Sequence, residues 1–244
     1  MTSQKIFPDT LLCLMRHGAI DAAKEKHFVG QINPPLSPSG RKQAEWQGRQ
    51  LMNIPFSSVW CSDLKRAHET AEIVCRNRGL AMLSTPELRE INLGQWDGVA
   101  MSQIREQFPH LWQARGENIG HFRPPGAESF ADLQQRVVPF IRHITSQSAG
   151  NTLIITHAGV IRVLLCHVLQ MPLSQLFKIH LEYGGLTIIK DINGMSRVKT
   201  VNLYSALLTP DNLIKERKML LTKHHSYSSE SSEGRVSCCP TMVI

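Results

Sequence analysis

The sequence predicts an α/β domain with a largely parallel sheet. Short apolar segments of strand length alternate with longer segments in which apolar residues recur every three or four positions, and this is the pattern of strands joined by helices. No unit of about 20–50 residues repeats along the chain, which argues against a solenoid or a propeller. A chain of 244 residues with 42% hydrophobic residues has the size and composition of one ordinary globular domain.

Three strands and two helices are predicted in the first part of the chain. The strand candidates are Leu11–Met15, Ser58–Cys61 and Leu80–Leu83. Ser37-Pro38 predicts the start of a helix that continues to about Met52, because serine caps a helix well and proline suits the first turn. The next helix is indicated by a stripe of apolar residues at the spacing of one helix face: Leu64, Ala67, Ala71 and Val74.

The rest of the domain continues this alternation. Ser102–Phe108 is predicted as a short helix, and Gln113–Pro125 as a long loop or a partly helical lid because it has no clear period. Ser129 is expected to cap a longer amphipathic helix. The last elements are a strand at Leu153–Thr156, a helix at Val160–Leu169, and a hairpin of Leu186–Ile189 with Arg197–Leu203 around Asn193-Gly194.

The domain is expected to cover residues 1–204. A C-terminal extension with helical potential is predicted at 205–221. Residues 222–244 are rich in serine and lack apolar periodicity, so we expect a disordered tail. Cys238 and Cys239 lie in this tail, and the last four residues do not form a prenylation box.

Charge and composition exclude several classes of protein. Lys plus Arg exceeds Asp plus Glu by 27 − 20 = 7, but the basic residues are dispersed, so we expect small anionic substrates rather than nucleic acid. No apolar run reaches the roughly 20 residues of a membrane-spanning helix, and residues 1–10 lack a secretory signal. We therefore expect a cytoplasmic protein with no membrane partner.

The six cysteines form no C-x-x-C pair, which predicts free thiols and no zinc site.

Polar and small residues follow four predicted strands at the point where each strand ends. They are Arg16, His17 and Gly18 after the first, Ser62 and Arg66 after the second, Glu90 after the third, and His157, Ala158 and Gly159 after the fourth. Ligands of open α/β sheets bind beyond the carboxyl ends of the strands. These residues are therefore expected to form one site.

The chemistry of these side chains suits phosphoryl transfer. Arg16 and Arg66 offer planar forks for phosphate oxygens, and Gly18 lets the backbone approach closely. A helix that starts after His157 aims free N–H groups at the same place. A neutral His17 can then attack phosphorus in line and form a phosphohistidine.

Glu90 is the candidate general acid for the leaving alkoxide, and it could take a proton from water in the second half-reaction. With two arginines and a second histidine near the phosphate, we expect no metal and no other cofactor.

Each residue also has an ordinary structural explanation when it is taken alone. His157 could simply cap its helix, Arg66 could lie on a solvated helix face, and Glu90 could be a loop carboxylate. Their joint placement at strand ends favours a site.

Other histidines have no partner at the spacing of a metal site. Those expected to be non-catalytic are His68, His143, His167, His224 and His225. His27 and Phe28 follow the predicted nucleophile and are candidates for substrate contact.

The chain resembles the histidine phosphatase superfamily, in the branch that contains cofactor-dependent phosphoglycerate mutase. The resemblance covers about Leu11 to Leu203 and rests on six blocks in the same order. They are Arg16-His17-Gly18; Leu36-Ser37-Pro38-Ser39-Gly40 with Gln43-Ala44; Ser62-Asp63-Leu64-Lys65-Arg66-Ala67 with Thr70-Ala71; Leu88-Arg89-Glu90 with Gly94, Trp96 and Gly98; Pro125-Gly126-Ala127-Glu128-Ser129; and Thr156-His157-Ala158-Gly159.

This resemblance implies a three-layer α/β/α sandwich with a mostly parallel sheet, like that of phosphoglycerate mutase, and a reaction without a metal. It implies a nucleophile at His17, phosphate contacts at Arg16, Arg66 and His157, and a proton donor at Glu90. Candidate substrate-binding residues are Gly18, Gly30, Ser62 and Ala158.

Two positions depart from the family pattern. An acidic residue usually follows the glycine, where this chain has Ala19, and many members carry an asparagine six residues after the nucleophile, where this chain has Ala23. The missing asparagine argues against a mutase. Among phosphatases, the chain is most similar to α-ribazole phosphatases of cobalamin synthesis, including Met171-Pro172-Leu173. The implied reaction is hydrolysis of a small phosphorylated metabolite, with α-ribazole 5′-phosphate as the first choice.

Three other functions stay open. Broad-specificity sugar-phosphate phosphatases share most of the same blocks. A phosphoglycerate mutase is disfavoured by Ala23. A catalytically silent phosphate-binding regulator would keep the pocket, but it would have no need of a proton donor such as Glu90. The oligomeric state is not predicted.

Overall fold

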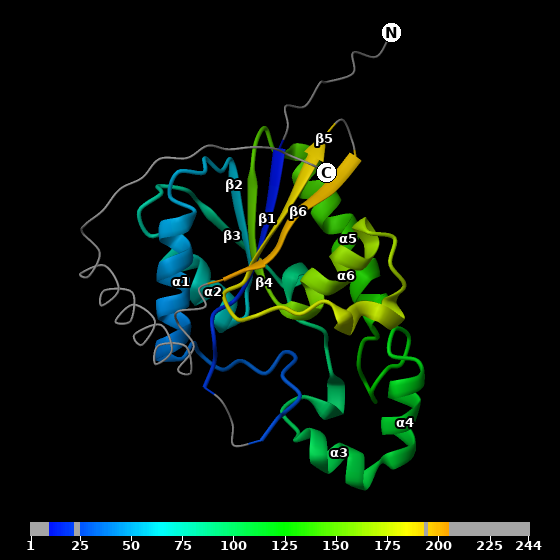
Figure 1. The fold of residues 1–244 in the computed structure, drawn as a ribbon. Coiled ribbons are helices and arrows are strands. Elements are labelled where there is room, and N and C mark those ends of the chain that lie inside the picture. The colour runs from blue at the N-terminus through cyan, green and yellow to red at the C-terminus, as the bar shows by residue number, and fades with distance from the viewer. Residues whose placement is uncertain (1–9, 22–24, 193–194, 205–244) are drawn as a thin grey trace, which may run out of the picture. The chain divides into compact units, whose positions relative to one another are not determined.

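A six-stranded sheet organises the domain. The computed structural model describes residues 10–21, 25–192 and 195–204. The strands are β1 Thr10–Arg16, β2 Ser58–Ser62, β3 Met82–Thr85, β4 Thr152–Thr156, β5 Leu186–Ile192 and β6 Met195–Leu203, in the spatial order β3-β2-β4-β1-β5-β6 (Figure 1). β3, β2, β4 and β1 are parallel, whereas β5 is antiparallel to both of its neighbours. The predicted α/β domain with a mostly parallel sheet is confirmed.

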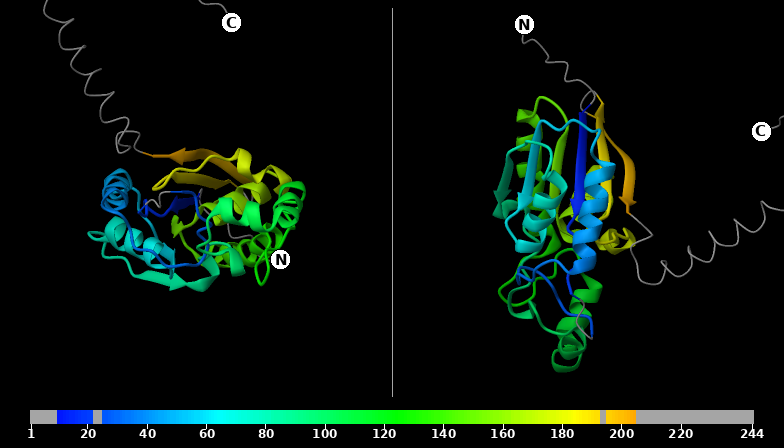
Figure 2. Two further views of the ribbon diagram at one scale, coloured as in Figure 1. Left: turned by 90° about the horizontal axis from the view of Figure 1, so that it is seen from below. Right: turned by 90° about the vertical axis from the view of Figure 1, so that its left-hand side faces the viewer.

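Helices cover both faces of this sheet. They are α1 Pro38–Gln50, α2 Lys65–Cys75, α3 Met101–Gln107, α4 Pro109–Glu117, α5 Phe130–Gln147 and α6 Ala158–Val168, with short 3₁₀ helices η1 Pro86–Leu88, η2 Gly94–Trp96 and η3 Leu173–Lys178. α1 and α2 lie on one face, and α5 and α6 lie on the other (Figure 2). α3 and α4 lie beyond the edge at which β1 ends (Figure 1). This is the expected three-layer α/β/α sandwich.

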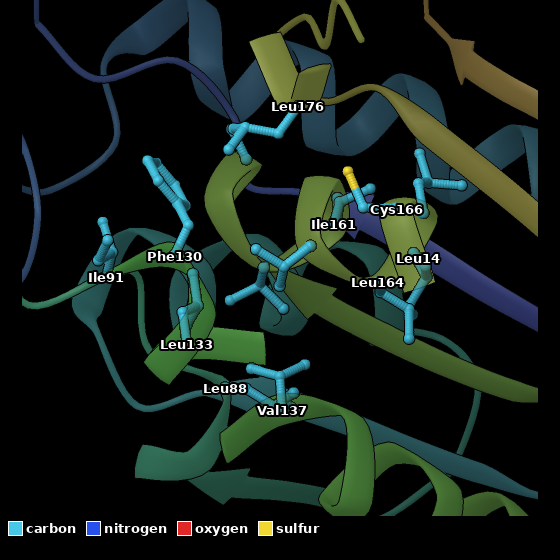
Figure 3. Packing of buried hydrophobic residues seen from close by; sticks show 14 of the residues in the cluster. Leu14, Leu88, Ile91, Phe130, Leu133, Val137, Ile161, Leu164, Cys166 and Leu176 are labelled. Carbon is cyan, nitrogen blue, oxygen red and sulfur yellow. The ribbon is translucent and has the colours of Figure 1, made fainter. Parts of the chain in front are cut away.

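The central strands are apolar on both faces because each face meets helices. In β1, Leu14 joins the core under α5 and α6, while Cys13 and Met15 join the core under α1 and α2. Figure 3 shows the first of these cores, to which Leu14, Leu133, Val137, Ile161 and Leu164 all belong. All five residues of β4 are buried. Each fully buried Leu or Ile side chain stabilises the fold by roughly 1.5–3 kcal/mol, so the two cores fix the strand ends that carry polar residues.

Two helices begin where the sequence predicts, for the predicted reasons. Ser37 Oγ accepts a hydrogen bond from the Gly40 N–H at 3.1 Å, and Pro38 occupies the first turn of α1. At the start of α5, Ser129 and Asp132 each accept from the other's backbone N–H, which is a capping box.

Two details differ from the predicted elements. β3 lies at Met82–Thr85 rather than Leu80–Leu83, because Met82 pairs with Val59 of β2 and thereby sets the register. Since β3 is an edge strand, its Leu83 is 46% exposed, and the apolar pattern alone is a poor guide there. The segment predicted as partly helical contains the end of α4, and this helix begins at Pro109 because proline is favoured in a first turn.

Several predictions concern residues outside the described ranges. They are the turn at Asn193-Gly194, the extension at 205–221, and the tail at 222–244 with Cys238 and Cys239. The domain boundary at residue 204 also stays a prediction. β5 and β6 pair antiparallel, as expected for a hairpin.

The described cysteines are free thiols: Cys13, Cys61, Cys75 and Cys166. Burial raises the pKa of Cys13 to about 12 and that of Cys61 to about 11, so both thiols are unreactive at neutral pH. Across the described part of the chain, no helix is long and apolar enough to cross a membrane.

Candidate active site

The predicted residues meet at the edge of the sheet where the parallel strands end. His17 directly follows β1, Ser62 is the last residue of β2, and His157 directly follows β4. The imidazole rings of His17 and His157 lie with their centroids 5.1 Å apart. The backbone N–H of His17 donates to the Thr156 carbonyl at 2.9 Å, so the pairing of β1 with β4 sets this separation.

His17 is a buried, neutral imidazole with one nitrogen available. Its side chain contacts the Gly18 carbonyl through Nδ1 at 2.7 Å, and because a carbonyl only accepts, Nδ1 carries the hydrogen. Nε2 therefore keeps its lone pair, which accepts from Arg66 Nε at 3.3 Å. Burial, together with the positive charges of Arg66 and Arg16, holds the pKa of His17 well below its ordinary value.

Arg66 is completely buried and is held by carbonyl oxygens. Its Nη1 donates to Ile32 at 2.7 Å and its Nη2 donates to Gly30 at 2.6 Å. The loop that supplies these carbonyls is fixed by Asp97, whose carboxylate accepts from the backbone N–H of Gly30 and of the next two residues. The structure thus places Gly30 behind Arg66, and a direct contact of Gly30 with substrate stays a prediction.

His157 is a second neutral imidazole, and Ser62 fixes its orientation. Ser62 Oγ accepts from the Leu64 N–H at 3.3 Å and lies 2.8 Å from His157 Nε2, so its hydroxyl hydrogen is free to point at that nitrogen. This assignment leaves the hydrogen on His157 Nδ1, which is buried and has no hydrogen-bond partner among the described residues. Burial lowers the pKa of His157 well below its ordinary value, and the positive charge of Arg66 lowers it further. An orphaned N–H donor in a cationic site suits an anionic ligand.

Glu90 lies at the start of α6, where backbone N–H groups point at it. Its Oε1 accepts from the Ile91 N–H at 2.9 Å, and its Oε2 accepts from the Gly159 N–H at 3.1 Å. A Cβ atom on Gly159 would lie only 2.1 Å from Oε1. Glycine is therefore required at this position if the carboxylate is to reach the helix end.

Arg16, the last residue of β1, brings a second positive charge near His17. Its Nη1 donates to the Leu181 carbonyl at 2.6 Å, and its guanidinium lies 3.7 Å from the centre of the Tyr183 ring. Its Nε is buried and finds no acceptor within the described chain. Tyr183 is also 5.5 Å from the His17 ring, and sequence reasoning missed it.

Two further residues from the sequence prediction shape the backbone around His17. Gly18 donates its N–H to Thr70 Oγ1 at 3.1 Å, and a Cβ atom on it would lie 2.3 Å from the Gly40 carbonyl oxygen. Ala158 is buried and begins α6. Ala19 donates its N–H to Gln43 at 2.8 Å, and Ala23 lies outside the described residues.

A family model for the histidine phosphatase superfamily, branch 1, matches residues 12–203. The chain belongs to this superfamily. The match spans every strand end described above, from His17 to His157, and it establishes the protein as a phosphatase.

Named relatives act on different substrates. An adenosylcobalamin/alpha-ribazole phosphatase of Salmonella typhimurium is 30% identical over 78% of this chain and 95% of its own length. The crystal structure of the alpha-ribazole phosphatase from Shigella flexneri matches with a TM-score of 0.73 and 27% identity, over 79% of this chain and 96% of that one. A mycobacterial glucosyl-3-phosphoglycerate phosphatase matches with a TM-score of 0.71 and 25% identity, over 79% of this chain and 98% of that one.

The other histidines and Phe28 have the following neighbours where the structure describes them. His68 contacts Glu72 at 3.5 Å, and His167 contacts Arg142 at 2.9 Å. Phe28 is buried and packs on Trp96 with ring centres 5.3 Å apart, and its contact with substrate stays a prediction. His143 is exposed on α5, the His27 ring contacts a backbone carbonyl, and His224 and His225 are outside the described ranges. Of the residues that the structure describes, no group of three could hold a metal ion.

We expect Gly159→Ala to displace Glu90, because the added methyl would lie 2.1 Å from Oε1, far inside van der Waals contact. Turnover of an alkyl phosphate should fall at least about tenfold, the scale of about 1.4 kcal/mol in barrier. Gly116→Ala on α4 is the matched control, since nothing lies within 4 Å of the added atom there. Steady-state kinetics of both variants decide the point, and a Gly159→Ala enzyme as active as the control would contradict it.

The two buried neutral histidines should make stability depend on pH. In the unfolded chain a histidine protonates with a pKa near 6.5, so below about pH 6.5 the unfolded state binds more protons than the folded state. The free energy of unfolding should therefore be fully retained above this pH and fall as the pH drops toward 5, by at most about 1.4 kcal/mol per unit for each histidine. Urea unfolding at several pH values measures it. His157→Gln should flatten the slope, whereas His143→Gln should leave it unchanged; equal slopes in both variants would refute this origin.

Proposed function

We propose that this histidine phosphatase hydrolyses a small phosphomonoester through a phosphohistidine at His17. The observation that carries the proposal is a buried, neutral imidazole beside two guanidinium groups that form no ion pair within the described residues. Their positive charge is available to a phosphate dianion, and Nε2 of His17 lies where Arg66 would hold the phosphoryl group.

In the first step, the Nε2 lone pair of His17 forms a bond to phosphorus while the bond from phosphorus to the leaving oxygen breaks. Glu90 acts as the general acid and gives a proton to that oxygen. In the second step a water molecule attacks phosphorus, its proton passes to Glu90, and the N–P bond breaks. Inorganic phosphate leaves, and both residues return to their starting state.

Arg16, Arg66 and His157 are proposed to bind the phosphoryl oxygens. The donors that fit this role are the orphaned Arg16 Nε and His157 Nδ1 and the Arg66 Nε that now reaches His17. Such preorganised donors stabilise the charge that develops on the equatorial oxygens. Ser62 supports His157, while Gly18, Gly30 and Ala158 shape the backbone around the pocket. No metal or other cofactor is required in this scheme.

The substrate we propose is α-ribazole 5′-phosphate. Support comes from the relatives named alpha-ribazole phosphatase and from the resemblance that includes Met171-Pro172-Leu173. Ala23, in place of the asparagine of mutases, favours hydrolysis over phosphoryl return to a second hydroxyl. A cytoplasmic location likewise stays a proposal.

We expect kcat/KM for α-ribazole 5′-phosphate to exceed that for 3-phosphoglycerate by at least about tenfold, or about 1.4 kcal/mol, with no mutase activity. Both compounds should be assayed with purified protein in the presence and absence of a chelator, which should change neither value. His17→Ala is the control that should remove all turnover. Efficient interconversion of phosphoglycerates, or wild-type turnover in the variant, would overturn the proposal.

Glu90→Gln should separate substrates by leaving group. An alkoxide leaves poorly without a proton, so phosphorylation by an alkyl phosphate should slow roughly 10²–10⁴-fold. Nitrophenolate needs the proton far less, so the loss with p-nitrophenyl phosphate should be much smaller. Single-turnover phosphorylation is the assay, because a base role for Glu90 in the second step would mask the contrast in steady state. Equal losses for both substrates would assign Glu90 to holding the pocket instead.

A further inference from the structure

The Arg16 guanidinium is held by two neutral groups, a backbone carbonyl and an aromatic ring. Among the described residues it donates one hydrogen bond, from Nη1 to the Leu181 carbonyl, and lies 3.7 Å from the centre of the Tyr183 ring. Arg66, by contrast, donates three hydrogen bonds, to Ile32, Gly30 and His17. The ring of Tyr183 is therefore the main restraint on the plane of the Arg16 guanidinium.

An aromatic face is a suitable restraint for an arginine that must bind phosphate. A carboxylate would neutralise the charge of Arg16 and accept the N–H groups that the phosphate needs. A ring attracts the cation through its quadrupole and accepts none of the in-plane N–H donors. The Nε of Arg16 is buried and has no acceptor in the described chain, as expected if the ring leaves this donor free for phosphate.

We propose that Tyr183 is a positioning residue, which keeps the Arg16 guanidinium flat and charged with its free donors turned to the phosphoryl group. This inference rests on the proposed function of the same site. Tyr183 acts through Arg16 and exchanges no proton with the substrate.

The backbone around Tyr183 is fastened to the site, as a positioning role requires. The Gly184 N–H donates to the His17 carbonyl at 3.0 Å, and the Arg16 N–H donates to the Gly185 carbonyl at 3.0 Å. Gln47 of α1, almost fully buried, donates through Nε2 to the Gly184 carbonyl at 2.8 Å. The loop therefore cannot shift without moving the strand end that carries both Arg16 and His17.

Asn202 of β6 holds the same loop from the opposite side. Its Oδ1 accepts from the Glu182 N–H at 2.6 Å, and a Cβ atom on Gly185 would lie 2.3 Å from that oxygen. The final hairpin of the fold thus supports the ring that restrains Arg16.

The test compares Tyr183→Leu, which removes the ring, with Tyr183→Phe, which keeps the ring and removes only the hydroxyl. Orthovanadate is the probe, because it occupies a phosphate site without turnover, and isothermal titration calorimetry measures its affinity. We expect Tyr183→Leu to bind vanadate about tenfold more weakly, which corresponds to about 1.4 kcal/mol, and Tyr183→Phe to bind like wild type. Phe177→Leu is the matched control, since Phe177 is half exposed and lies against Arg115 and Arg162 instead; it should bind like wild type.

The same Leu substitution in an Arg16→Ala background shows whether Tyr183 acts through Arg16. There the substitution should change vanadate affinity by less than about twofold, because no guanidinium remains to be positioned. Unchanged affinity of Tyr183→Leu in the wild-type background, or an equal tenfold loss in both backgrounds, would overturn the inference. Hydrolysis of p-nitrophenyl phosphate by the wild type is measured in parallel. A wild-type protein that binds vanadate but does not hydrolyse p-nitrophenyl phosphate would contradict the proposed function. The effect of Tyr183 on vanadate affinity could still be measured in that case.

Discussion

A phosphate dianion can be bound tightly only by cations that are not already neutralised, and this requirement governs the arrangement around His17. Two guanidinium groups lie in a buried site, yet neither forms an ion pair with any carboxylate of the described chain. Backbone carbonyls hold Arg66, and a carbonyl with an aromatic ring holds Arg16. Desolvation lowers the pKa of both arginines, but an arginine remains charged at neutral pH. Burial and, after it, these same charges lower the pKa of the neighbouring histidines, so the arginines contribute both to phosphate binding and to a neutral nucleophile.

The sheet supplies the rigidity that such a charged cluster needs. β1 lies between β4 and β5, and backbone hydrogen bonds of His17 continue past its end on both sides, to Thr156 and to Gly184. Thr156 Oγ1 donates to the Leu88 carbonyl at 2.8 Å, which ties β4 to the segment that carries Glu90. Gly159 then lets that carboxylate reach the start of α6. Backbone geometry and the two apolar cores thus hold the like charges in place without a close ion pair in the described chain.

Much of this site could be predicted from the sequence because its residues sit where buried strands end. An apolar run followed by Arg-His-Gly or by His-Ala-Gly locates both the strand and its polar end. Tyr183 gives no such signal, since it precedes its strand. Only the antiparallel direction of β5 brings its beginning to the edge where the parallel strands finish. Closeness in sequence to His17 likewise does not reveal the aromatic core that Phe28 forms with Trp96 and Trp112. The register of β3 depends on pairing with β2, which no local pattern contains.

The site of phosphorylation tests the central claim most directly. The Gly18 carbonyl occupies Nδ1 of His17, which leaves Nε2 as the nucleophilic atom. Wild-type protein can be mixed with a phosphomonoester for a single turnover and quenched in base, because phosphohistidine is acid-labile. Peptide mass spectrometry then identifies the modified residue, and proton–phosphorus correlation NMR identifies the ring nitrogen. We expect the phosphoryl group on Nε2 of His17. Phosphoryl on Nδ1 or on His157, or full turnover with no phosphoprotein at any time, would contradict the claim.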